Sequence, residues 1–117
     1  MRYAVVGPSV YPDEDKVREA LNNHKNKISV LLIGPSEGVD AIAREYAIEN
    51  NIPVEMHIPE HMKNLDVKFD PEYCFKNCKK MVEKSNALLV FDGVDRHSTG
   101  FMVDYAKRLS RTIYHYR

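Results

Sequence analysis

The chain has 117 residues, 17 basic and 17 acidic side chains, and 44% hydrophobic residues. This length supports one domain with a modest core rather than two domains. A formal net charge of zero argues against a broad electrostatic surface for nucleic acid, and no apolar run approaches the roughly 18 residues of a membrane span. We therefore expect a single domain over residues 1–117 that binds neither membrane nor nucleic acid.

The N-terminus and the cysteines bear on the compartment of the protein. Met1–Val6 lacks the longer apolar core and the cleavage pattern of a signal peptide, and it is predicted to be the first strand of the fold. Cys74 and Cys78 lie one turn apart in a predicted helix, which is a poor framework for a stabilising disulfide. These features favour a reducing, cytoplasmic environment.

The first third of the chain alternates between a β-rich run and a helical period. The predicted strand Tyr3–Val6 is followed by a helix with Asp13 as its N-cap. A second predicted strand, Ile28–Ile33, is an apolar run broken only by Ser29, as expected of a strand covered on both faces. The helix between them presents one apolar face, which carries Val17, Ala20, Leu21 and His24.

The same alternation continues to the end of the chain. A helix with Val39, Ala43 and Ala47 on one face ends near Asn50–Pro53, and residues 59–71 show no period and are predicted to be a loop. The other predicted elements are strands over Val54–Ile58, Ala87–Phe91 and Thr112–Tyr116, a helix over Pro71–Lys84, a loop over residues 92–100, and a helix carrying Phe101, Met102, Tyr105, Ala106 and Leu109.

This pattern predicts an α/β fold: an open, mostly parallel five-stranded sheet with helices on both faces. In such sheets ligands bind beyond the carboxyl ends of the strands, where the strand order reverses. The loops that begin at Gly7, Gly34 and Asp92 each follow a predicted strand. We therefore expect these three loops to line one ligand-binding mouth.

The loop Gly34–Gly38 carries the strongest local signal for a ligand. Its glycines allow close approach to main-chain N–H groups, and the helix that follows adds unpaired donors and a partial positive charge. Ser36 is a further donor, whereas Glu37 and Asp40 repel phosphate but accept hydrogen bonds from ribose hydroxyls or a base amine. The structural alternative is that Asp40 only caps its own helix.

The other two loops repeat this pattern more weakly. Pro8 removes one donor from the first loop, so Gly7 and Ser9 supply the N–H groups there, with a tight structural turn as the alternative. Thr99, at a predicted helix start, serves either as a ligand contact or as an N-cap. The predicted binding residues are Gly7, Pro8, Ser9, Gly34, Pro35, Ser36, Glu37, Gly38, Asp40, Asp92, Gly93, Ser98, Thr99 and Gly100.

Four segments occur in a set order: "VVGPS", "LLIGPSEGVDAIAREYAIENNIPVE", "MVEKSNALLVFDG" and "STGFMVDYAKR". Together they resemble the SLOG superfamily, in its small stand-alone YpsA-related branch. Gly34, Gly38 and Asp40 match the second glycine-rich motif of that family, and Thr99 and Met102 match its last turn into a helix. The resemblance implies a Rossmann-like domain that binds a nucleotide-derived small molecule.

The chain departs from the family pattern where an anion would be bound. Glu37 stands where the family usually has arginine, and Pro8-Ser9 replaces Ser-Arg in the first loop. The sequence leaves open which cation compensates. The candidates are Lys63, Lys68, Lys76 and Arg96.

Three classes of function are compatible with these loops. The favoured one is binding, in which the ligand is sensed or sequestered without a cofactor. The enzymatic alternative is nucleoside deoxyribosyltransferase-like or N-glycosidic chemistry, with Asp92, Asp95 and Asp104 as candidate nucleophiles. The Pro-Gly-Gly-x-Gly-Thr-x-x-Glu motif of the related phosphoribohydrolases is absent, since Met102 takes the place of its glutamate. The third class is an oligomeric scaffold without a small ligand.

Two further patterns concern partners and metals. The aromatic final strand "TIYHY" favours a homo-oligomer. His57, His61, Cys74 and Cys78 match no established zinc pattern, and we predict no metal site. The run Lys76, Lys79, Lys80 and Lys84 is interpreted as the solvated side of a helix rather than a nucleic-acid surface.

Overall fold

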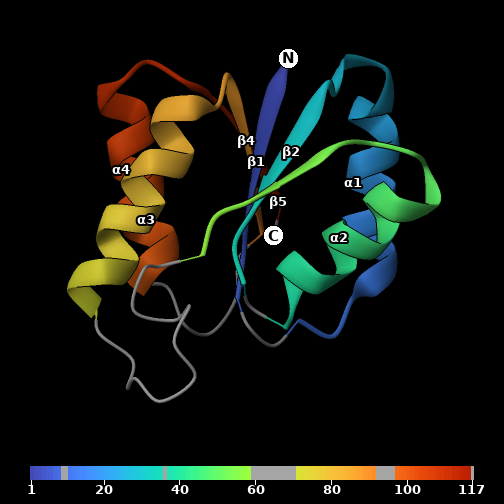
Figure 1. The fold of residues 1–117 in the computed structure, drawn as a ribbon, viewed down its shortest axis with the longest axis horizontal. Helices are drawn as coiled ribbons and strands as arrows, with labels where there is room; N and C mark the ends of the chain where they lie inside the picture. Colours follow the sequence, from blue (N-terminus) through green and yellow to red (C-terminus); the bar gives the residue numbers. More distant parts are fainter. Residues whose placement is uncertain (9–10, 36, 59–70, 92–96, 117) are drawn as a thin grey trace.

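The computed structural model describes residues 1–8, 11–35, 37–58, 71–91 and 97–116, without the side chains of residues 71–75, 97–99 and 101. This part of the chain forms one sheet with the strand order β3-β2-β1-β4-β5, and every neighbouring pair is parallel (Figure 1). The strands are β1 (Arg2–Val6), β2 (Val30–Ile33), β3 (Val54–Met56), β4 (Ala87–Phe91) and β5 (Thr112–Tyr116).

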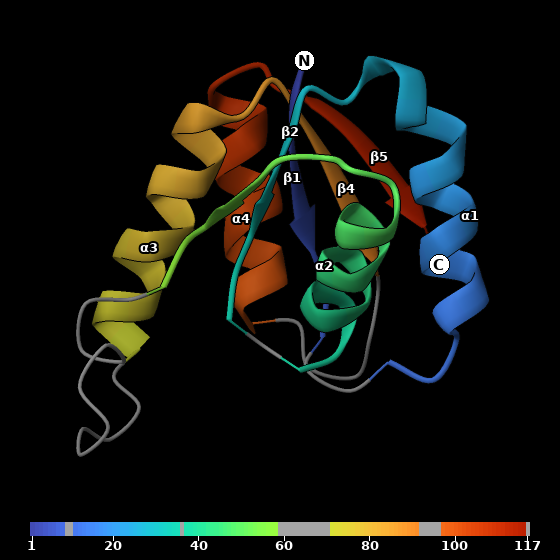
Figure 2. The same cartoon turned by 45° about the vertical axis from the view of Figure 1, so that its right-hand side comes forward.

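Two helices cover each face of the sheet (Figures 1 and 2). Tyr3 and Val5 of β1 pack toward one face, and Ala4 and Val6 pack toward the other, so the strand is buried on both sides. The α/β prediction is therefore confirmed, with a sheet that is entirely rather than mostly parallel. One face carries α1 (Glu14–His24) and α2 (Val39–Glu49), and the other carries α3 (Pro71–Lys84) and α4 (His97–Arg108).

The helix ends follow from local hydrogen bonding. The Asp13 side chain accepts a hydrogen bond from the Lys16 N–H at 3.0 Å, as predicted for the N-cap of α1. Helix α2 ends in a Schellman motif, in which Ile52 donates to the Ala47 carbonyl and Asn51 adopts a φ of 56°. Helix α4 ends in the same way, with Ser110 at a φ of 57°, so neither helix uses glycine to stop.

Three predicted boundaries were wrong by a few residues. β2 starts at Val30 rather than Ile28, because a short 3-10 turn over Lys25–Lys27 comes first. The Ile28 N–H donates to the Lys25 carbonyl and closes this turn. β3 ends at Met56 rather than Ile58. Helix α4 begins at His97, within the predicted loop. Among the described helices, none combines the length and the apolarity that crossing a membrane requires.

A buried histidine joins α1 to the β5 side of the sheet. The ring of His24 lies 3.4 Å from the Tyr3 hydroxyl through Nδ1 and 3.1 Å from the Tyr116 hydroxyl through Nε2. It also packs against the ring of Tyr114, with 4.3 Å between the centroids. Burial, and to a smaller extent the nearby Lys27 ammonium, lowers the pKa of His24 below its ordinary value.

We expect acid to destabilise the fold through this residue. When the pH falls from about 7.5 to about 5.5, His24 takes up a proton in the unfolded chain before it does so in the folded one, so the free energy of unfolding decreases. Urea titrations at both pH values should show a weaker pH dependence for His24→Phe than for the wild type. His115→Gln, at an exposed position of β5, is the control. Equal pH dependences for the two variants would contradict the prediction.

Candidate functional site

The carboxyl ends of the strands form one edge of the sheet, as all five strands point the same way. The register pairs Val6 with Val90 and Val5 with Ile33, so β1, β2 and β4 end at nearly the same level. The strand order reverses between β1 and β4, which makes this edge the place where doubly wound sheets bind ligands. The three predicted loops therefore start from one mouth, on the lower side of Figure 1.

Gly7, the first residue after β1, is required by packing. A Cβ at this position would lie 2.5 Å from Cγ2 and 2.8 Å from Cβ of Val39, the first residue of α2. The Val39 N–H also donates to the Pro8 carbonyl at 3.2 Å, which occupies one of the free donors at the start of this helix. The glycine thus lets the N-terminus of α2 rest directly on the end of β1.

Gly34, the first residue after β2, packs against the carboxylate of Asp40. A Cβ at Gly34 would be 2.9 Å from Oδ2 of Asp40, and Asp40 is only 7% exposed. The N-cap of α2 is Gly38, without a side-chain cap, so Asp40 does not serve as the N-cap. Its negative charge instead lies in the first turn, where it interacts favourably with the helix dipole.

Asp40 sets the charge at the start of α2. A phosphate there would meet a carboxylate in the same turn, and the two negative charges would repel each other. Hydroxyl and amine donors would instead find an acceptor. Glu37, also predicted to contact a ligand, is exposed beside this turn.

The third loop is described only in part. Helix α4 already includes His97, so Thr99 lies inside its first turn and is not its N-cap. A Cβ at Gly100 would have nothing within 4 Å, so packing does not require glycine there. The other predicted contacts that lie outside the described residues are Ser9, Ser36, Asp92 and Gly93, and the side chains of Ser98 and Thr99 also lie outside them.

An aromatic group that the sequence analysis missed lies at the same edge. Phe91, the last residue of β4, is fully buried and stacks on Tyr116 of β5, with 5.1 Å between the ring centroids. The Tyr11 ring meets Phe91 edge-on at 5.9 Å. Tyr11 and Tyr116 are half-buried. This cluster fixes the end of β4, from which the third loop starts, and only the tertiary fold brings its members together.

The histidine considered for a metal site belongs to a structural network at the β3 edge. His57 Nε2 lies 2.7 Å from Oε2 of Glu55, and Asn77 donates to the His57 carbonyl at 2.7 Å. Arg2 binds the same Glu55 oxygen at 3.0 Å. The hydrogen bond from His57 is the main reason why the pKa of Glu55 is lowered. The described residues contain no group of three or more potential metal ligands.

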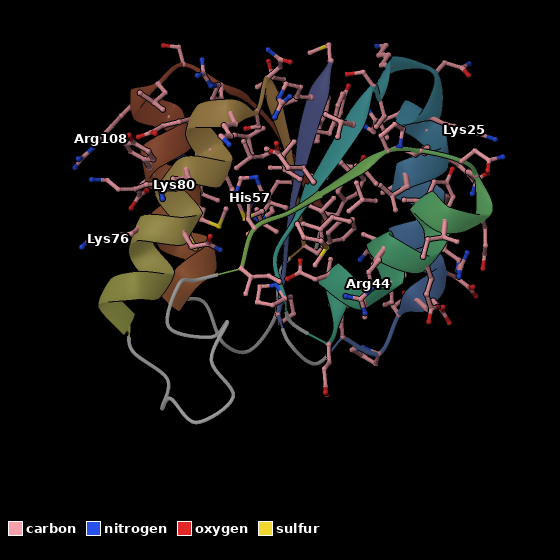
Figure 3. All side chains as sticks on the ribbon, in the orientation of Figure 1. Lys25, Arg44, His57, Lys76, Lys80 and Arg108 are labelled. Atoms are coloured by element: carbon pink, nitrogen blue, oxygen red, sulfur yellow. The ribbon has the colours of Figure 1, made fainter. Side chains whose placement is uncertain are left out.

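The remaining candidates are exposed on helices α3 and α4 or lie outside the described residues. Asp104, the candidate nucleophile that the structure describes, is exposed on α4. Lys76 is exposed on α3, and Figure 3 shows it pointing away from the sheet. The candidates outside the described residues are Asp92, Asp95, Lys63, Lys68 and Arg96.

Comparison with known proteins supports the fold. No protein-family model matches the chain, and no curated protein matches its sequence. The chain is similar in structure to DNA processing protein A (DprA) from Streptococcus pneumoniae, with a TM-score of 0.80 at 15% sequence identity. The match covers 97% of this chain and 49% of DprA, so the chain spans about half the length of that protein. The chain thus has a Rossmann-like α/β fold.

Proposed function

We propose that the chain binds a nucleotide-derived small molecule at the mouth of its sheet, and that it senses or sequesters the ligand rather than transforming it. The observation that carries this proposal is the strand order, which reverses at β1 and β4. The resemblance to the SLOG superfamily supports a nucleotide as the ligand and is itself part of the proposal. Binding without catalysis is favoured because Met102 stands where the related phosphoribohydrolases have their glutamate.

The loop after β2 would contact the sugar or the base rather than a phosphate. Asp40 is buried over Gly34 and brings a carboxylate to the first turn of α2. Ribose hydroxyls are donors of the required kind, and a hydrogen bond to a charged acceptor is stronger than one between neutral groups. Any anionic part of the ligand would then lie toward the other two loops.

The first experiment identifies the ligand. The purified protein is heat-denatured, and mass spectrometry of the supernatant reads what is released. A nucleotide-like mass would support the proposal, and its intact or cleaved state would separate a binder from an enzyme. An empty supernatant, together with no thermal shift from a panel of nucleosides, nucleotides and cyclic dinucleotides, would overturn the proposal in favour of the scaffold.

Replacement of Asp40 tests the sugar contact. Asp40→Asn keeps the shape but removes the charge, and we expect affinity for the ligand to fall by roughly tenfold to a hundredfold, since a hydrogen bond to a charged group contributes about 1.5–3 kcal/mol. Calorimetric titration with the nucleotide found by mass spectrometry measures the loss. Glu45→Gln, on the exposed side of the same helix, is the matched control and should bind normally.

A change in the ligand tests the same contact between Asp40 and the sugar. A 2′,3′-dideoxy analogue lacks the hydroxyls that Asp40 would accept from, so wild-type protein should bind it about as weakly as Asp40→Asn binds the parent. Combining the two changes should then cost little more than either alone. Fully additive losses would show that Asp40 does not contact the sugar.

A further inference from the structure

His57 is a buried residue whose ring is hydrogen-bonded on one side only. Its side chain is 7% exposed, and Nε2 lies 2.7 Å from Oε2 of Glu55. Its backbone is engaged as well, since the N–H donates to the Ile33 carbonyl and the carbonyl accepts from Asn77. Among the described residues, none forms a hydrogen bond with the other ring nitrogen, Nδ1. Buried polar atoms are normally hydrogen-bonded, so Nδ1 indicates an occupant that these residues do not supply.

Glu55 fixes which nitrogen of this ring carries the proton. The hydrogen bond from His57 lowers the pKa of Glu55, with smaller contributions from the charges of Lys84 and Arg2, so Glu55 is a carboxylate at neutral pH. A carboxylate only accepts hydrogen bonds, which places the proton of the neutral ring on Nε2. Arg2 binds the same carboxylate oxygen at 3.0 Å and holds it in place. Nδ1 of the neutral ring therefore carries a lone pair and is an acceptor.

His57 lies at the carboxyl edge of the sheet, beside the loop after β2. Met56, the last residue of β3, pairs with Ile33, the last residue of β2. His57 and Gly34 are thus the first residues after two neighbouring strands, and such strands lie about 4.8 Å apart. His57 is therefore one strand away from the contact between Gly34 and Asp40.

The His57 ring and Asp40 belong to opposite faces of the sheet. Glu55 pairs with Leu32, which packs in the core under α3 and α4, and the hydrogen bond to Glu55 places the His57 ring on that same face. Figure 3 shows His57 between β3 and α3. Asp40 belongs to α2, which covers the other face. A ligand that crosses the end of β2 would thus have Asp40 on one side and His57 on the other.

We propose that Nδ1 of His57 accepts a hydrogen bond from an amino group on the base of the bound nucleotide. This inference rests on the proposed function, in which Asp40 takes the sugar hydroxyls, so the donor left for a second acceptor is the exocyclic amine of the base. A phosphate would instead need a donor at this position. Because a base without the amine leaves Nδ1 unpaired, the site selects amino-bearing bases. Glu55 is a positioning residue, since it acts on the ligand only through the His57 ring.

Probes that differ by one amino group test this contact without any change in the protein. The pairs are adenosine and purine riboside, guanosine and inosine, and cytidine and pyrimidin-2-one riboside, each as nucleoside and as 5′-monophosphate. In calorimetric titrations we expect at least one amino-bearing member to bind roughly tenfold more tightly than its partner, the effect of about one hydrogen bond. Equal binding within every pair, as for a site that holds only water, would overturn the inference and leave the proposed function intact. If none of the probes binds, the proposed function fails and this inference falls with it.

His57→Gln separates Nδ1 from the contact with Glu55. The glutamine amide keeps a donor for Glu55 in place of Nε2, but it leaves no acceptor in place of Nδ1. The variant should stay folded, which circular dichroism checks, and should bind the two members of the discriminating pair within about twofold of each other. His115→Gln, at an exposed position of β5, is the control and should keep the preference of the wild type. A preference that survives in folded His57→Gln would contradict the inference.

The pH dependence of this preference is a result that a purely structural histidine would not produce. When the pH falls from about 8 to about 5.5, histidine side chains take up a proton, and a protonated Nδ1 donates instead of accepting. The charged groups around the ring are Glu55 of β3, Arg2 of β1 and Lys84 of α3, and their residue types ordinarily titrate outside this range. The ratio of the two affinities within the discriminating pair should therefore fall toward one, and this ratio cancels any general effect of acid on the fold. A ratio that stays constant over this range would refute a contact through Nδ1.

Discussion

Gly7→Ala should lower the free energy of unfolding by about 2–3 kcal/mol, at the upper end of what overpacking a core contact costs. The added methyl would lie 2.5 Å from Cγ2 and 2.8 Å from Cβ of Val39. Val39 is fully buried and begins α2, so the helix itself has to move away from the end of β1. Urea unfolding of the variant measures the loss.

Gly100→Ala is the matched control. A Cβ at Gly100 meets nothing within 4 Å, and Gly100 lies in helix α4 without a positive φ. Alanine is therefore expected to stabilise the fold there, by up to about 1 kcal/mol. The same substitution should thus have opposite signs at the two glycines. Equal effects would mean that packing against Val39 is not what requires Gly7.

A double-mutant cycle locates the cause of the Gly7 effect. Val39→Ala removes the two methyl groups at 2.5 and 3.1 Å but leaves the Cβ at 2.8 Å. The double variant should therefore be less destabilised than the sum of the single changes, yet still less stable than Val39→Ala alone. Strict additivity would indicate that the strain comes from another neighbour.

The fold could be predicted from the sequence because its signals are local and redundant. The β-rich runs alternate with helical periods, and Asp13 is a helix cap that depends on its own turn alone. The predicted start of β2 was wrong because the chain makes a short 3-10 turn first. The Ile28 N–H donates to the Lys25 carbonyl at 3.4 Å, so the first residues of the apolar run close this turn and the strand begins at Val30.

The site was less accessible to the same reasoning. Gly7 and Gly34 were predicted correctly to follow strand ends. The sequence could not show whether the missing side chain leaves room for a ligand or for a neighbouring side chain, such as that of Val39 beside Gly7. Asp40 was predicted as either ligand contact or cap, and only the tertiary structure shows it over Gly34.

Phe91→Ala should be the most destabilising of the substitutions considered, lowering the free energy of unfolding by about 3–5 kcal/mol. Phe91 is fully buried at the end of β4, and removal of its ring leaves Tyr116 and Tyr11 without their stacking and edge-on partner. For a domain whose whole stability is about 5–15 kcal/mol, such a loss approaches unfolding at room temperature. Urea titration measures the loss of unfolding free energy. If the variant has too short a folded-state baseline in urea, thermal melting takes its place.

Phe91→Leu separates the volume of this side chain from its aromatic contacts. Leucine fills most of the space, so the variant should lose less than half as much stability as alanine does. If the cluster also positions the loop after β4, Phe91→Leu should weaken ligand binding while the protein stays folded, and Leu88→Met, on the opposite face of the same strand, should not. Equal binding by these two variants would confine the aromatic cluster to a structural role.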